Sequence, residues 1–128
     1  MANRYALLPL ALFASACIAQ NPLAVPSALD LDTFHLEVDE HVHQFYPGIS
    51  TNTYGASAEY LGPTLILDRN DTARIWVHNQ LGQITSMHWH GMHVPGVMDG
   101  GPQRIINPGE SWMAEFPVKN PAATYWYH

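Results

Sequence analysis

Three segments of the chain alternate apolar and polar residues with a period of two, at residues 34–39, 73–78 and 112–116. Successive side chains of a β-strand point to opposite faces, so this period predicts strands with one buried face and one polar face. His35 and His78 fall on the polar side of their strands. We therefore expect both imidazoles to face solvent.

Shorter apolar runs at 64–67, 87–90 and 124–128 predict further strands. Residues 48–62 are rich in Gly, Ser, Thr and Asn, which favours a loop or an irregular edge, and the Pro-Gly and Asp-Gly-Gly-Pro turns of 94–108 predict a long loop. No segment of useful length has a helical period. The pattern therefore predicts an all-β fold, an antiparallel β-sandwich, and we expect it to lack at least one closing strand.

The N-terminal segment has the layout of an export signal. One basic residue precedes an apolar run, and small residues lead to Cys17, which predicts a signal peptide over residues 1–17. The sequence before Cys17 also resembles a bacterial lipoprotein box, so simple cleavage and lipidation of Cys17 both remain open. Residues 18–32 contain two prolines and predict a tether, which leaves 33–128 as one domain in an exported, periplasmic or cell-envelope protein.

Composition narrows the range of functions. The chain of 128 residues carries 11 acidic and 5 basic residues, and the basic ones are scattered, so no nucleic-acid-binding surface is indicated. Cys17 is the single cysteine. A blue-copper site needs a cysteine thiolate beside two histidines, and a cysteine-based structural zinc site needs several cysteines, so the predicted domain holds neither.

The histidines suggest a different metal chemistry. His88 and His90 flank Trp89, and His128 follows a second aromatic segment. On a strand, His88 and His90 point the same way and lie about 6.6 Å apart, which suits two neighbouring metal ions better than one. Neutral imidazole binds copper, zinc, iron and nickel.

At these segments the chain resembles the multicopper oxidases, specifically their N-terminal cupredoxin-like (plastocyanin-like) domain. The similarity covers roughly residues 34–128 and is closest to bacterial copper-efflux oxidases and bilirubin-oxidase-like members. The resemblance implies a Greek-key β-sandwich of the cupredoxin type. The matching pieces are Leu61-Gly62-Pro63-Thr64, Asn79-Gln80-Leu81, Met87-His88-Trp89-His90-Gly91, Val94-Pro95-Gly96, Asp99-Gly100-Gly101-Pro102-Gln103, Ile106-Asn107-Pro108-Gly109 and Pro121-Ala122-Ala123-Thr124-Tyr125-Trp126-Tyr127-His128.

The resemblance also implies roles for individual residues. His88 matches the ligand of the type 2 copper, and His90 and His128 match ligands of the type 3 coppers. Asp99 matches an acidic residue that supplies protons to reduced oxygen, although Asp-Gly-Gly is also an ordinary turn sequence. The other cluster ligands and the type 1 copper are expected in a C-terminal domain. The implied partners are O2 and a reducing substrate such as cuprous ion or a phenol, and we expect the fragment alone to be inactive.

Two other functions remain open at this point. The same histidines suit a non-enzymatic copper-binding or copper-delivery module, or a mononuclear hydrolytic site of three histidines and a water. His41, His43 and His93 are interpreted as histidines without a metal. The methionines Met87, Met92, Met98 and Met113 are interpreted as packing residues, although methionine sulfur also suits Cu(I).

Overall fold

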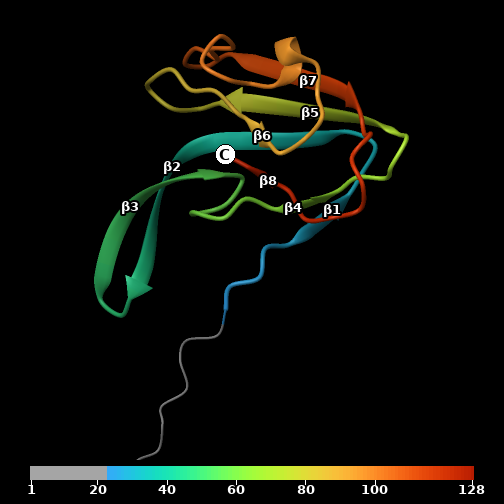
Figure 1. Ribbon diagram of the computed structural model, residues 1–128. Coiled ribbons are helices and arrows are strands. Elements are labelled where there is room, and N and C mark those ends of the chain that lie inside the picture. Colours follow the sequence, from blue (N-terminus) through green and yellow to red (C-terminus); the bar gives the residue numbers. More distant parts are fainter. Residues whose placement is uncertain (1–22) are drawn as a thin grey trace, which may run out of the picture.

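The computed structural model describes residues 23–128 (Figure 1). The predicted signal peptide, Cys17 with its possible lipid, and the first part of the predicted tether lie outside the described residues. Within the described part of the chain, no helix combines the length and the apolar character needed to cross a membrane.

A four-stranded sheet forms the main layer, in the order β3-β2-β5-β7. Its strands are β2 (Phe34–Tyr46), β3 (Ile49–Ala56), β5 (Thr72–Asn79) and β7 (Ser111–Pro117). The three strands predicted from alternation correspond to β2, β5 and β7, which confirms their existence, although β2 continues beyond the predicted 34–39 to Tyr46. The prediction of a loop or irregular edge for 48–62 is wrong for β3, which pairs with β2 because a tight turn at Gly48 returns the chain along it.

The pairing of β2 with β5 is parallel, so this sheet is mixed rather than purely antiparallel. Parallel neighbours need a long crossover connection, and here β3 and β4 (Thr64–Ile66) lie between the two strands in the sequence. The β2–β3 and β5–β7 pairs are antiparallel, as expected. The alternation of apolar and polar residues along a strand predicts which of its faces is buried. It does not predict whether the neighbouring strand runs parallel or antiparallel to it.

Two short strand pairs complete the fold. β1 (Ala28–Asp30) pairs in parallel with β4, so part of the segment predicted as a tether is a strand of the folded unit. β6 (Trp89–His90) pairs antiparallel with β8 (Trp126–Tyr127), as the short apolar runs predict. The predicted long loop after β6 contains one turn of 3-10 helix, η1 (Gly96–Met98), which is the only helical element among the described residues.

The core lies between the main sheet and these short pairs. The inward positions of β2, β5 and β7 are buried, and Phe34, Leu36 and Phe116 are at most 1% exposed. Trp89 of β6 packs in the same cluster, and Tyr127 of β8 packs against it. The all-β prediction is confirmed, and the core holds the β6–β8 pair in place from one side.

Candidate metal centre

The β6–β8 pair brings together two segments that are 38 residues apart in the sequence. His90 lies opposite Trp126 in the register. Beyond the pair, the backbone N–H of His88 donates to the carbonyl of His128 at 2.8 Å, and the N–H of His128 donates to the carbonyl of His88 at 3.1 Å. His88 and His128 are therefore direct cross-strand neighbours.

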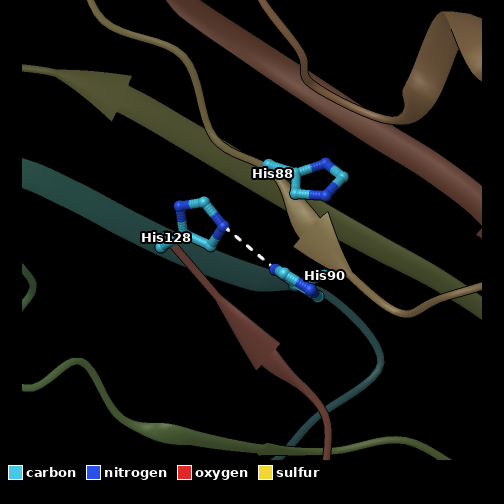
Figure 2. A group of neighbouring side chains, drawn as sticks. All are labelled: His88, His90 and His128. Atoms are coloured by element: carbon cyan, nitrogen blue, oxygen red, sulfur yellow. Dashed lines mark hydrogen bonds between the residues drawn. The ribbon is translucent and has the colours of Figure 1, made fainter.

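The three histidine rings converge in front of this pair (Figure 2). One ligand atom from each of His88, His90 and His128 lies within 4.8 Å of the other two. The ring centroids form a nearly equilateral triangle, with separations of 5.7, 5.5 and 5.6 Å. We call these residues the three-histidine group; within residues 23–128 no other set of three His, Cys, Asp or Glu residues converges this closely.

The orientation of His88 is set by the backbone of the following loop. Its Nδ1 lies 2.7 Å from the carbonyl oxygen of Asp99, so Nδ1–H donates and Nε2 is left as the free ligand atom. The carboxylate of Asp99 is also close, with Oδ1 3.4 Å from the same nitrogen. The structure therefore places Asp99 beside His88.

Gly100 allows this loop to approach the strand. A Cβ atom at this position would lie 1.5 Å from the carbonyl oxygen of Met87, and the φ of Gly100 is +75°. Both features require glycine. The Asp-Gly-Gly turn thus brings the Asp99 carbonyl onto His88, and this role of Gly100 is not apparent from the sequence alone.

Tyr127 anchors the other strand. Its hydroxyl donates to the carbonyl of Pro63 at 2.7 Å, and a Cβ atom on Gly62 would lie 2.2 Å from that hydroxyl oxygen. Desolvation by burial raises the pKa of Tyr127 from 10.0 to about 12. Gly62 and Pro63 were missed as supports of the site, although both lie in a motif that carries the family resemblance.

Aromatic side chains lie on both faces of the β6–β8 pair, and Trp126 is on the same face as the three histidines. Trp126 is 60% exposed, and its ring lies 4.9 Å from that of His90 and 4.8 Å from that of His128. Trp89 is buried, and its Nε1–H donates to the carbonyl of Met98 at 3.0 Å. One face of the pair is thus fixed in the core while the other presents the three rings.

The donor set of the three-histidine group fits copper. Three imidazole nitrogens are ligands that copper accepts readily, and the carbonyl bonded to His88 is the type of outer partner that holds a ligating histidine in one orientation. His90 Nδ1 and His128 Nε2 are 3.4 Å apart, at hydrogen-bonding distance (Figure 2). Imidazole alone does not distinguish copper from zinc.

The remaining histidines and methionines lie elsewhere. His43 pairs with the carboxylate of Glu59, and the backbone N–H of His93 donates to Asn120, so neither joins the three-histidine group. His41 is likewise separate, on β2. Met87 is buried in the core, and Met92 and Met98 pack against it, which confirms the packing interpretation for these three.

Comparisons with known proteins match this architecture. A sequence profile of the multicopper oxidases matches residues 37–128. Multicopper oxidase mco of Staphylococcus aureus is 37% identical over 116 residues, which cover 85% of this chain and 26% of that protein. Cell division protein FtsP of Escherichia coli is 35% identical over 118 residues, which cover 90% of this chain and 25% of that protein. The chain thus spans about a quarter of the length of these curated relatives.

Solved structures give the same result. A laccase-like multicopper oxidase CueO from the lignin-degrading bacterium Ochrobactrum sp. superposes with a TM-score of 0.79 at 34% identity, covering 84% of this chain and 25% of that one. A laccase from Pediococcus acidilactici superposes with a TM-score of 0.79 at 30% identity, and the match covers 86% of this chain and 26% of that one. These similarities confirm the cupredoxin-type fold.

Proposed function

Because the chain belongs to the multicopper oxidase family, we propose that it is the copper-binding first domain of an oxidase. The whole protein would couple one-electron oxidation of a reducing substrate to the four-electron reduction of O2 to water. The observation that carries the proposal is the convergence of His88, His90 and His128 within 4.8 Å. A fold alone does not fix an activity, and the relatives include a protein named for cell division, so the argument depends on this group.

We assign His88 to the type 2 copper and His90 and His128 to the type 3 coppers of a trinuclear cluster. The other ligands and a type 1 copper would come from a C-terminal domain of the same protein. When bound, the three coppers of the cluster and the type 1 copper would together supply the four electrons that O2 needs, one from each ion, without releasing partly reduced oxygen. The reducing substrate is proposed as cuprous ion or a phenol; the Ochrobactrum relative is described as acting on lignin model compounds and lignosulfonate.

The residues of this chain hold and orient the ligands. The Asp99 carbonyl keeps the proton of His88 on Nδ1, which leaves Nε2 unprotonated toward the centre. The ring of Trp126 covers His90 and His128 and restricts their rotation. The carboxylate of Asp99 lies beside His88 and is proposed to pass protons toward the oxygen that is being reduced.

Two other functions fit the site less well. A copper-delivery module would use the same histidines, but the family to which the chain belongs is one of oxidases. A mononuclear hydrolytic site would need the three nitrogens around one ion and an open position for water. Turnover with O2 distinguishes the oxidase from both.

Single substitution of His88, His90 or His128 by Ala in the full-length protein tests the proposal. We expect each variant to lose bound copper and O2 consumption with a phenol or cuprous ion, while His93→Ala, a histidine outside the group, keeps both. Elemental analysis and an oxygen electrode provide the measurements. Full copper content and turnover in all three variants would refute the assignment.

Asp99→Asn removes the carboxylate of this residue but keeps its backbone carbonyl, so it tests the two contributions separately. The backbone carbonyl that orients His88 is retained, so we expect copper content to stay constant. Removal of the proton donor is expected to lower turnover with O2 by about 10²-fold or more. Unchanged turnover would exclude the proton role.

We also propose that the protein is exported to the periplasm or cell envelope, on the basis of the signal-like segment 1–17. Mass spectrometry of the mature protein tests this and the alternative fates of Cys17. A mature chain that begins at a lipid-modified Cys17 supports anchoring. An intact N-terminus in the mature protein would contradict export by this signal.

A further inference from the structure

A second pair of histidines lies on the outer face of the main sheet, away from the three-histidine group. His35 of β2 lies opposite Trp76 of β5 in the parallel register, and Glu37 lies opposite His78. Their neighbours in the sequence, such as Phe34 and Val77, point into the core, so these side chains point outward. His35 Nδ1 and His78 Nε2 are 3.0 Å apart. We call His35, His78 and Glu37 the outer-face group.

Neighbouring side chains hold this group in place. The Nδ1 atom of His78 lies 2.7 Å from the hydroxyl oxygen of Ser111 on β7. The Oε1 atom of Glu37 lies 3.9 Å from His78 Nε2. The other carboxylate oxygen of Glu37 accepts a hydrogen bond from the side chain of Gln80 at 2.9 Å. His78 and Glu37 thus each have an outer partner that fixes their orientation.

We propose that the outer-face group is a second metal site, which takes a divalent ion of borderline softness such as Zn²⁺ or Cu²⁺. Two nitrogens bound to one ion at about 2.0–2.1 Å each lie about 3 Å apart in a cis arrangement, which is close to the separation of the two histidine nitrogens. Without metal, the two rings share a single hydrogen bond, with their planes 5° apart. Metal binding would release that proton to solvent and would require both rings to turn, so that their lone pairs converge on one ion.

The chemistry of the three ligands favours such an ion. Two imidazoles and a carboxylate are common ligands of Zn²⁺, with water completing the coordination. The hydroxyl of Ser111 on the far nitrogen of His78 matches the outer-shell contact that orients ligating histidines. The group is less convergent than the three-histidine group and is partly open to solvent, because Glu37 is half-exposed. We therefore expect weaker, reversible binding.

The site shares no residue with the proposed copper centre, so it stands independently of the proposed function. Its three ligands come from β2 and β5, whereas His88, His90 and His128 lie on or directly beside β6 and β8. Loss of metal at one place is therefore not expected to remove it from the other. This independence makes the two proposals separable by experiment.

Equilibrium dialysis of the copper-loaded full-length protein against Zn²⁺ tests the inference. We expect the wild-type protein to bind one zinc ion per chain at this site in addition to its copper. His35→Ala and His78→Ala should each lose this zinc ion while their copper content stays unchanged. Glu37→Gln should weaken binding without abolishing it. The matched control is His43→Ala, which removes another surface histidine paired with a carboxylate and should retain that zinc. Equal zinc retention by all of the variants would overturn the proposal.

Fluorescence provides a second measurement that does not depend on the alanine variants. The Trp76 ring lies 6.5 Å from that of His35 and 6.1 Å from that of His78, so Cu²⁺ bound there should quench its emission. We expect Trp76→Phe to remove one component of the quenching and to leave zinc binding intact. Identical quenching amplitude in wild type and Trp76→Phe would place the added ion elsewhere and would refute the site.

Discussion

The two histidine groups of this domain are built on different kinds of scaffold. The three-histidine group is presented by β6 and β8, strands of two residues each, and its geometry depends on contacts from loops. The outer-face group lies on β2 and β5, strands of 13 and 8 residues, and its geometry follows from their register. A centre held by loops is sensitive to single loop residues, whereas one held by register is sensitive mainly to its own ligands.

Gly100→Ala gives the strongest test of this difference. The added Cβ meets the Met87 carbonyl, and the positive φ adds about 1–3 kcal/mol of strain, so the loop must move away from His88. We expect copper affinity to fall by about 10- to 100-fold while zinc binding at the outer-face group is unchanged. Dialysis measures both. Gly82→Ala is the control, because its Cβ meets open space; equal copper retention by the two variants would contradict the role of the loop.

Ser111→Ala applies the same kind of change to the outer-face group. Loss of the hydroxyl frees the far nitrogen of His78, so we expect zinc affinity to fall about tenfold. Copper in the three-histidine group should not change, since Ser111 contacts none of its ligands. Zinc titration with elemental analysis tests both statements. A loss of copper with unchanged zinc affinity would show that Ser111 supports the three-histidine group and not the outer-face group.

Tyr127→Phe tests the anchor of β8 and has a defined pH dependence. At neutral pH we expect the free energy of unfolding to fall by about 1 kcal/mol, because the hydrogen bond to Pro63 is lost. The pKa of Tyr127 is raised from 10.0 to about 12, so above pH 10 the unfolded chain ionises before the folded one. The stability that the wild-type tyrosine contributes is therefore complete below pH 10 and declines toward pH 12.

Urea unfolding of the wild type and Tyr127→Phe across this range provides the measurement. The difference between the two proteins should be constant below pH 10 and should shrink above it. A difference that grows with pH would mean that the tyrosine is ionised in the folded protein.

Met92→Leu should leave both metal sites unchanged. The two side chains have similar volume, so we expect a stability change below about 1.5 kcal/mol and no change in either metal content. Thermal unfolding and elemental analysis provide the check. A selective loss of bound Cu(I) would show that this methionine is a ligand and not only a packing residue.

Much of this architecture could be predicted from the residues. Alternation located β2, β5 and β7, since a half-buried strand needs apolar side chains on one face only. The His88-x-His90 spacing located two members of the three-histidine group, and the resemblance located His128. β3 was missed because its polar residues, such as Thr51 and Asn52, are exposed at the sheet edge and leave no apolar pattern.

The outer-face group could not be found in the same way. His35 and His78 are 43 residues apart and meet only because β2 and β5 pair in parallel, a pairing that depends on the crossover between them. The prediction that both face solvent describes each residue and misses the contact between them. Likewise, the support of Gly62 for Tyr127 depends on a contact between segments 65 residues apart. Such long-range contacts have no local signal.

The convergence of the three histidines on copper can be observed in diffraction data collected at the copper absorption edge from crystals of the copper-loaded full-length protein. We expect anomalous peaks at bonding distance from a ring nitrogen of each of His88, His90 and His128. Copper peaks elsewhere, with the ring of His128 turned away from the other two, would contradict it.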